Sequence, residues 1–323
     1  MHTKSGYLFG AKQHRLYYRA WFPEHPPQAA VAIVHGLGSH GSTFMNAVNT
    51  FFPQDYAVYV LDLRGHGRSS GQRGYINHWS EFRTDFHIFL QLVERQQPHV
   101  PLFAWGHSLG GAIVLDYVLH SPHLLMGIIV SGLPMGAVGV SPWKLAISSL
   151  LSQLWPRFSL NTGIDLASNS SDPAVLLDYS QDPLRHTQGT ARLATEFLRI
   201  QAELQVHAAN LRLPLLMLHG SNDQTASLTE SVAFFQKVGS RTKQHLEYPG
   251  AFHDLHANLD AQTVLADMSQ WLRQQLASFE KNKDRRLIGI SLAFCGFFQR
   301  AYELTNDIGL GPLCFFCIAV QYF

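Results

Sequence analysis

The chain has 323 residues, of which 46% are hydrophobic and 15% charged, so a folded protein with a sizeable core is expected and a disordered chain is excluded. A formal net charge of +1 provides no field for a polyanion, and we expect no nucleic-acid partner. The cysteines (Cys295, Cys314 and Cys317) exclude a disulfide framework and a four-thiolate zinc site, and they fit a reducing compartment. At the N-terminus, Met1–Gly10 lacks the apolar run of a signal peptide, which predicts a cytoplasmic protein.

Short apolar runs then alternate with segments of helical period. The runs Gly6–Phe9 and Arg15–Phe22 predict an antiparallel hairpin at a sheet edge. Buried strands are predicted at Ala30–Val34, Tyr56–Leu61, Leu102–Trp105, Gly127–Ser131, Leu215–Leu218 and His245–Tyr248. Helices are predicted at Glu81–Arg95, Leu109–His120, Leu228–Val238 and Ala261–Phe279. This alternation is typical of an α/β fold with a mostly parallel central sheet covered by helices on both faces.

The alternation breaks between residues 134 and 212. An apolar helix is predicted at Trp143–Trp155, a polar stretch follows at Asn161–Asp182, and a second helix is predicted at Thr190–Ala209. We therefore predict a core made of residues 1–133 and 213–280, with 134–212 inserted as a helical cap.

The segment 281–323 differs in kind from the rest. Its apolar runs, Leu287–Phe298 and Ile308–Val320, are 12 and 13 residues long, short of the ~20 needed to span a bilayer. We favour an arm packed on the domain or a non-native tail from a shifted reading frame. An interfacial membrane anchor is the alternative, although neither run has a clear basic amphipathic face.

Gly106-His107-Ser108-Leu109-Gly110 matches the G-x-S-x-G pattern of a nucleophile elbow, in which a strand turns sharply into a helix. The segment Gly67–Gly71 matches the same pattern around Ser69. Ser108 lies between a predicted strand and a predicted helix, whereas Ser69 has neither. We therefore predict Ser108 as the nucleophile and Ser69 as a loop serine.

A serine nucleophile needs a base, and the base needs an orienting acid, in the chain order serine, acid, histidine. Asp223 follows the predicted strand at 215–218, and His253 follows the strand at 245–248. Both lie at the carboxyl edge of the sheet, where Ser108 also lies. His256 is the alternative base, and Asp254 is expected to be a surface or helix-start carboxylate.

Acyl transfer also requires donors for the developing oxyanion. The strand at 30–34 leads into His35-Gly36-Leu37-Gly38, so the amides of Leu37 and Leu109 are predicted to form the oxyanion hole. The loop Asp62–Ser69 at the same edge is given a structural role, and His35, His107 and His219 are predicted to form local hydrogen bonds. No pattern of metal ligands and no dinucleotide fingerprint is present, so no metal and no cofactor is expected.

Together these motifs, with Gly220–Asp223 and Gly250–His253, resemble the monoacylglycerol lipase and lysophospholipase branch of the α/β-hydrolases, which overlaps the serine aminopeptidase-like group. The resemblance covers about residues 5–280. It implies a triad of Ser108, Asp223 and His253, the oxyanion amides named above, and a mobile cap. One departure is that the branch typically has Glu, Arg and Tyr after its H-G-x-G motif, where this chain has Ser39, Thr43 and Phe44.

The expected function is serine hydrolysis of lipid-type carboxylic esters, such as monoacylglycerols or lysophospholipids, through an acyl-enzyme. We expect part of the apolar set in and before the cap to line an acyl tunnel, with simple packing as the alternative: Leu133, Met135, Trp143, Leu145, Ile147, Leu150, Leu151, Leu154 and Trp155. The expected partner is a small lipid ester, with peripheral membrane contact through cap or tail. Amide hydrolysis, acyl transfer and a catalytically silent binding module remain alternatives, and the sequence leaves the oligomeric state open.

Overall fold

The computed structural model describes residues 2–136, 149–163 and 165–281 of the chain. The chain divides into two units, Met1–Trp271 and Leu272–Phe323, and every strand of the described residues lies in the first of them. The two apolar runs predicted after residue 286 lie outside the described residues.

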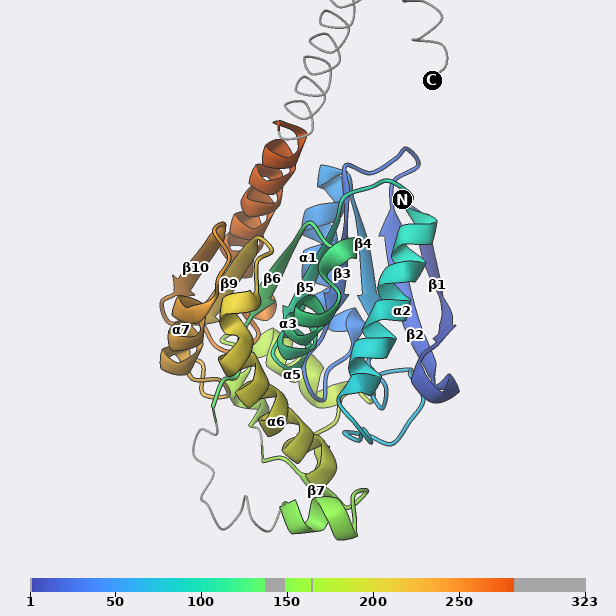
Figure 1. Ribbon diagram of the computed structural model, residues 1–323, viewed down its shortest axis with the longest axis vertical. Coiled ribbons are helices and arrows are strands. Elements are labelled where there is room, and N and C mark those ends of the chain that lie inside the picture. Colours follow the sequence, from blue (N-terminus) through green and yellow to red (C-terminus); the bar gives the residue numbers. More distant parts are fainter. Residues whose placement is uncertain (1, 137–148, 164, 282–323) are drawn as a thin grey trace, which may run out of the picture. The chain divides into compact units, whose positions relative to one another are not determined.

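An eight-stranded sheet forms the centre of the first unit (Figure 1). Its strands, in spatial order, are β1 (His2–Phe9), β2 (Arg15–Phe22), β4 (Tyr56–Leu61), β3 (Ala29–Val34), β5 (Leu102–His107), β6 (Gly127–Ser131), β9 (Leu215–Gly220) and β10 (Lys243–Tyr248). β1 and β2 pair antiparallel at one edge, and the strands from β4 to β10 are parallel. The predicted hairpin and the predicted mostly parallel sheet are both confirmed.

The helices of the described residues include all four that the core sequence predicts. The helices are α1 (Met45–Phe51), α2 (Ser80–Gln96), α3 (Leu109–His120), a short helix over residues 149–154, α5 (Pro173–Gln181), α6 (Ala191–His207), α7 (Leu228–Lys237) and a last helix over residues 261–281. The short α1 and α5 were not predicted. Within the described residues, no helix combines the length and apolar character needed to cross a bilayer.

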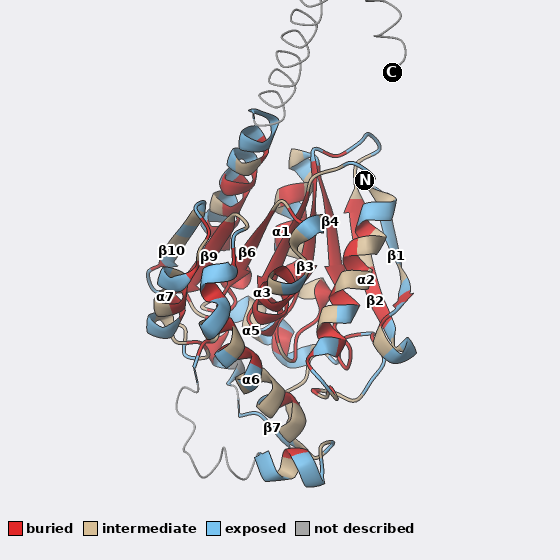
Figure 2. Cartoon of the chain, viewed as in Figure 1, coloured by how far each residue is buried: buried red, intermediate tan, exposed pale blue. Residues whose placement is uncertain are grey.

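The strands β4, β3, β5, β6 and β9 are buried on both faces, which explains their continuous apolar runs (Figure 2). The edge strand β10 is only partly buried, so the prediction of a buried strand at His245–Tyr248 was wrong about its burial. On one face, side chains such as Ala32 and Ala104 pack with α2 and α3 in the main hydrophobic cluster. On the other face, the Trp105 ring lies 5.1 Å from Phe44 and 6.3 Å from Phe51, which precede and belong to α1. Helices therefore cover both faces, as predicted.

Residues 134–212, called the insertion below, separate β6 from β9. They contain α5, α6 and a two-stranded sheet of β7 (Ser159–Asn161) and β8 (Gln188–Thr190). Asp172 accepts a hydrogen bond from the Ala174 amide and caps α5, and Thr190 caps α6 through the Leu193 amide. Of the helix predicted at Trp143–Trp155, residues 149–154 are helical and 143–148 lie outside the described residues.

Candidate active site

The register of the sheet brings four strand ends to one edge. Val34 pairs with Gly106, His107 with Ser131, and Ser131 with Leu218. The loops that follow β3, β5, β6 and β9 therefore start at nearly the same level. The loop after β10 joins them, because the Asn222 amide donates to the carbonyl oxygen of Ala251 at 3.0 Å. This carboxyl edge is where parallel α/β sheets place their ligand sites.

Ser108 occupies a strained turn between β5 and α3. Its φ of 53° and ψ of −117° lie in a region that L-residues rarely adopt. The turn is tight, since a Cβ atom on Gly106 would lie 2.3 Å from the carbonyl oxygen of Gly110. The Ser108 amide donates to the carbonyl oxygen of Ser131 at 2.9 Å, which fixes the turn to β6. This is the geometry expected of a nucleophile elbow.

Asp223 and His253 form a buried hydrogen-bonded pair. Nδ1 of His253 lies 2.7 Å from Oδ2 of Asp223. The other carboxylate oxygen of Asp223 accepts the amides of Thr225 and Ala226, each at 2.8 Å, so the side chain is held in place from two directions. Because the ionised carboxylate can only accept, Nδ1 of His253 carries the proton and Nε2 presents the lone pair.

The protonation of this pair follows from burial and hydrogen bonding. Burial alone would raise the pKa of Asp223, but the hydrogen bonds from His219 and His253 outweigh it and hold that pKa well below its ordinary value. Burial alone would lower the pKa of His253, but the hydrogen bond and charge of Asp223, with the charge of Asp254, raise it. Asp223 is therefore an ionised carboxylate that stabilises the imidazolium His253 becomes when it accepts a proton, as a general base requires.

The end of β6, at Ser131 and the adjoining Gly132, places Ser108 and His253 in the same region. The carbonyl oxygen of Ser131 accepts the hydrogen bond from the Ser108 amide. A Cβ atom on the next residue, Gly132, would lie 3.1 Å from Nδ1 of His253. The loop after β3 closes on the same place, since a Cβ atom on Gly36 would lie 3.1 Å from Cβ of Ser108. Ser108, His253 and the β3 loop thus border one small volume at the sheet edge.

Two backbone amides near this volume have no protein acceptor. Among the described residues, the amides of Leu37 and Leu109 donate to neither a backbone nor a side-chain group. Leu109 is the first residue of α3, where the helix leaves its amides unpaired and the helix dipole favours negative charge. Gly38, with φ of 73°, turns the β3 loop beyond Leu37. These are the properties that an oxyanion hole needs.

The loop Asp62–Ser69 has the structural role that the sequence suggested. Asp62 accepts the amides of Gly41 at 2.7 Å and of Arg68 at 2.8 Å. Ser69 donates its hydroxyl to the Asp62 carbonyl oxygen at 2.6 Å and accepts the Tyr17 amide at 2.8 Å. Both capacities of the Ser69 hydroxyl are used in holding the turn to β2, so the second G-x-S-x-G match is a loop serine.

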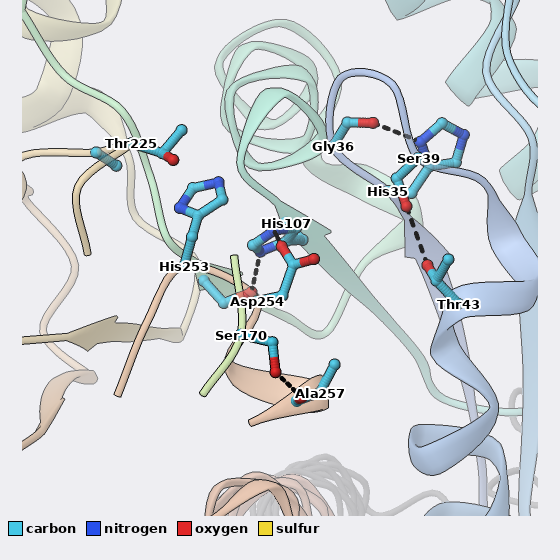
Figure 3. A network of polar contacts seen from close by, with 12 residues as sticks. His35, Gly36, Ser39, Thr43, His107, Ser170, Thr225, His253, Asp254 and Ala257 are labelled. Atoms are coloured by element: carbon cyan, nitrogen blue, oxygen red, sulfur yellow. Dashed lines mark hydrogen bonds and ion pairs between the residues drawn. The ribbon is translucent and has the colours of Figure 1, made fainter. Parts of the chain in front are cut away.

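A second imidazole–carboxylate pair lies beside the first, and the sequence reading missed it (Figure 3). Nε2 of His107 lies 2.9 Å from Oδ1 of Asp254, and the His107 and His253 rings are 4.8 Å apart. Asp254 is only 5% exposed, so it is not a surface carboxylate, but it does lie at a helix start, directly before the 3-10 helix Leu255–Ala257. The available signal was its position: in the turn after His253, it can reach back to the residue before Ser108.

His256, the alternative base, is buried against aromatic rings. It stacks on Phe44 with 4.1 Å between ring centroids and lies edge-on to Trp105 at 5.8 Å. Among the described residues, neither ring nitrogen of His256 has a hydrogen-bond partner, whereas His253 has the carboxylate that orients a base. The geometry therefore favours His253 over His256.

The insertion is joined to the loop that carries His253. The amide of Asp254 donates to the carbonyl oxygen of Asn169 at 2.7 Å. The hydroxyl of Ser170 donates to the carbonyl oxygen of Ala257 at 2.6 Å (Figure 3). Ser171 continues the pairing through its amide, which donates to Oδ1 of Asn258 at 3.0 Å. Residues 168–171 and 253–259 thus pack as one hydrogen-bonded unit.

Among the described residues, His107, His253 and Asp254 are close enough to share a cation, with candidate ligand atoms within 4.8 Å of one another. These atoms already have protein partners: His107 bonds Asp254, and His253 bonds Asp223. Hydrogen bonding accounts for the cluster, and we assign it no metal role.

Comparison with known proteins gives the family. The Hydrolase_4 family, described as serine aminopeptidase, S33, matches residues 25–260. The chain belongs to this family. A monoacylglycerol lipase of Mycolicibacterium smegmatis is 31% identical over 85% of this chain and 99% of its own length. The monoglyceride lipase of Mus musculus is 27% identical over 84% of this chain and 91% of its own length.

Solved structures agree on the fold. The Paleococcus ferrophilus monoacylglycerol lipase superposes with a TM-score of 0.74 at 24% identity, covering 80% of this chain and 99% of that one. A soluble variant of the Saccharomyces cerevisiae monoglyceride lipase, in complex with a substrate analog, has a TM-score of 0.74 at 25% identity, covering 84% and 94%. The chain is an α/β-hydrolase of the class that cleaves carboxylic esters with a serine nucleophile, as the motifs suggested.

Proposed function

We propose that this protein hydrolyses carboxylic esters of single-chain lipids, monoacylglycerols or lysophospholipids, with Ser108, His253 and Asp223 as its triad. The observation that carries the proposal is the buried 2.7 Å pair of His253 and Asp223 beside the strained Ser108 turn. The substrate class is supported by the printed names of the monoacylglycerol lipase relatives.

The chemistry follows from these groups. Nε2 of His253 takes the Ser108 hydroxyl proton as Oγ attacks the ester carbonyl carbon, and the carbonyl oxygen becomes an oxyanion facing the amides of Leu37 and Leu109. When the tetrahedral centre collapses, His253 returns the proton to the departing alcohol. Water, deprotonated by His253, then releases the fatty acid and restores Ser108. Asp223 keeps the Nδ1–H tautomer and stabilises the imidazolium in both steps.

The insertion is proposed as a cap that brings apolar surface to this site. Six large apolar side chains of the insertion are exposed in the described residues: Leu150, Leu154, Trp155, Leu160, Leu177 and Val206. The expected acyl tunnel needs revision, because Leu150, Leu154 and Trp155 face solvent while Leu133 and Met135 are core residues. Trp143, Leu145 and Ile147, also expected in the tunnel, lie outside the described residues.

The exposed apolar side chains support peripheral contact with the lipid surface that presents the substrate. Leu154→Glu with Trp155→Glu should reduce binding to phosphatidylcholine vesicles and raise KM for a vesicle-borne ester. The same variant should keep the turnover of a water-soluble p-nitrophenyl ester. Phe9→Glu, which alters a side chain 61% exposed on edge strand β1, is the matched control. Equal vesicle binding by wild type, double variant and control would remove this part of the proposal.

Polar side chains at the loop after β3 support an assignment of the substrate's head group. Ser39 hydrogen-bonds Thr43 at 3.0 Å, and the Arg185 guanidinium donates to the Ser39 hydroxyl at 3.3 Å. Arg185 also lies over the Tyr179 ring at 3.7 Å. A cation at this loop supports a phosphate-bearing lysophospholipid as a substrate, beside a neutral glycerol ester.

The test is a substrate panel with a covalent probe. Wild type should be labelled by a fluorophosphonate and should hydrolyse 1-acylglycerols and lysophospholipids, whereas Ser108→Ala should lose labelling and at least about 10³-fold in kcat. Asp223→Asn should retain the fold and lose most activity. A folded wild-type protein that is neither labelled nor active would overturn the proposal.

The serine aminopeptidase description of the family supports amide hydrolysis as a second candidate. The same triad can cleave both bonds, so the leaving group must be tested directly. Matched p-nitrophenyl esters and aminoacyl p-nitroanilides distinguish the two, and a higher kcat/KM for the anilides would reverse the assignment.

A further inference from the structure

His107 and Asp254 each lie one peptide bond from a residue of the proposed triad. His107 is the last residue of β5 and precedes Ser108, while Asp254 follows His253. The 2.9 Å bond between Nε2 of His107 and Oδ1 of Asp254 therefore joins the nucleophile's neighbour to the base's neighbour. The bond spans 147 positions of sequence and lies between side chains that are 3% and 7% exposed.

A chain of hydrogen bonds determines the direction of this contact. Nε1 of Trp105 can only donate, and it donates to Oγ of Ser131 at 2.9 Å. Oγ of Ser131 lies 3.1 Å from Nδ1 of His107, and burial lowers the pKa of His107 despite the opposing effect of Asp254, so the ring is neutral. The Ser131 hydroxyl then donates to Nδ1, and Nε2–H of His107 donates to Asp254. The imidazole is held at both nitrogens.

Backbone contacts anchor the other half of the pair. The Asp254 amide donates to the Asn169 carbonyl oxygen at 2.7 Å, and the Asp254 carbonyl oxygen accepts Nδ2 of Asn258 at 2.9 Å. The loop that carries the Asp254 carboxylate is thus held in place, and the carboxylate contacts the sheet by its hydrogen bond to His107. Figure 3 shows this contact next to the His253 ring.

On the proposed function, which it deepens, we infer that His107 and Asp254 form a positioning clasp that sets the approach of His253 to Ser108. Small errors in that approach are costly, because a displacement of about 1 Å can reduce turnover about 100-fold. Neither side chain need touch the substrate, because the clasp acts by positioning Ser108 and His253, which do touch it.

The clasp also places a second negative charge near the base. The groups that face His253 and its loop from the packed elements are Asp223 after β9, Asp254 and His256 in the loop itself, His107 on β5, Tyr179 on α5 and Arg185 after α5. Asp223 and Asp254 raise the pKa of His253. Removal of the Asp254 charge should lower that pKa and move the acid limb of kcat/KM toward lower pH.

The test uses three variants of the full chain. His107→Leu removes the clasp, His107→Gln keeps an N–H that can reach Asp254, and Asp254→Asn removes the charge. We expect about a 10- to 100-fold loss of kcat for His107→Leu with KM changed less than about 3-fold, and recovery of most of that loss in His107→Gln. Asp254→Asn should move the acid limb down by about 0.5–1 pH unit. The His107→Leu/Asp254→Asn double variant should lose much less than the product of the single losses.

Asp116→Asn is the matched control. Asp116 is a fully buried carboxylate on α3 that binds Arg83 at 2.7 Å, so its loss should reduce stability without moving the pH profile. If His107→Leu and Asp254→Asn resemble this control in kcat and pH profile, the clasp is wrong. Should Asp254→Asn not fold, equal kcat values for the two His107 variants would overturn it just as well.

A readout that needs no turnover separates this inference from the proposed function. The His253 ring can be followed by NMR in ¹³C-histidine protein, with its resonance assigned by His253→Gln. A lower His253 pKa in Asp254→Asn supports the clasp even if wild type hydrolyses none of the esters, which is the failure of the proposed function. An unchanged His253 titration in a protein that does hydrolyse them rejects the clasp alone.

Discussion

His186 of the insertion donates its backbone N–H to the carbonyl oxygen of Gly38, at 3.0 Å. Its own carbonyl oxygen lies 2.0 Å from the position that a Cβ atom on Gly38 would occupy. The loop proposed to supply the oxyanion amide of Leu37 is therefore packed backbone to backbone against the insertion. Any side chain at residue 38 would have to displace one of them.

Gly38→Ala should lower kcat/KM by about 100-fold or more, because the displaced loop no longer aims the Leu37 amide at the oxyanion. Gly163→Ala is the matched control: its φ of 72° is nearly that of Gly38 at 73°, yet a Cβ atom there meets nothing within 4 Å. Both variants incur the backbone cost of about 1 kcal/mol for a positive φ, and only Gly38→Ala adds a collision. Steady-state kinetics that show similar losses in both would contradict this reading.

The strain at Ser108 should be measurable as stability. Ser108→Gly and Ser108→Ala both remove the nucleophile, but only glycine adopts a φ of 53° with ψ of −117° at low cost. We expect Ser108→Gly to be more stable than Ser108→Ala by about 1 kcal/mol in urea unfolding, although glycine usually destabilises a fold. The reverse order would mean that the turn is not strained.

Buried neutral histidines should make the fold sensitive to acid. Burial, with the charge of Arg185, lowers the pKa of His256 to about 3, although Asp254 opposes the shift. The folded state therefore stays unprotonated at His256 while the unfolded chain binds a proton below about pH 6.5, so this group costs stability as pH falls from about 6.5 toward 3.

His256→Phe should keep the stacking on Phe44 and remove that cost. Relative to wild type, the variant should gain about 2 kcal/mol of unfolding free energy between pH 7.5 and pH 5. Urea titrations at the two pH values measure this gain. His25→Phe, at a side chain 62% exposed, should show no such gain, and equal gains in both variants would refute the assignment.

The insertion is also held by an ion pair at the β3 loop. Nε2 of His40 lies 2.6 Å from Oδ2 of Asp182, and although burial would raise the pKa of Asp182, the bond from His40 lowers it. Asp182→Asn should loosen this contact and speed limited proteolysis within the insertion about 3- to 10-fold. Asp178→Asn, at an exposed position on α5, should leave the cleavage rate as it is. Identical rates in both variants would exclude a holding role for Asp182.

Local patterns predicted the centre of the sheet well because β3, β4, β5, β6 and β9 are buried along their whole length. Tyr56–Leu61 and Gly127–Ser131 agree with β4 and β6 to the residue, and Leu109–His120 agrees with α3. The ends of β5 and β9 were placed two residues early, since His107 and Gly220 pair in the ladder without being apolar. The residue type at a strand end therefore locates that end less precisely than the hydrogen-bond pattern of the sheet does.

What the sequence could not show are contacts made across the fold. α5 begins at Asp172-Pro173, a cap and first-turn signal, inside a stretch that otherwise has loop composition. β7 and β8 have three residues each, too few for a periodic pattern, and they exist because residues 159 and 190 pair. The His107–Asp254 bond depends on the end of β5 meeting the loop after β10, 147 positions away, so its one sign in the sequence is that each residue adjoins a predicted triad residue.

The hydrogen bonds between residues 168–171 and 253–259 couple any movement of the insertion to the loop that carries His253. Any swing of the insertion that pulled these residues from the sheet would take the His253 loop along, and the imidazole would leave the serine. An uncovered active site would then be chemically silent. Bulk water entering during such an excursion would meet a serine without its base.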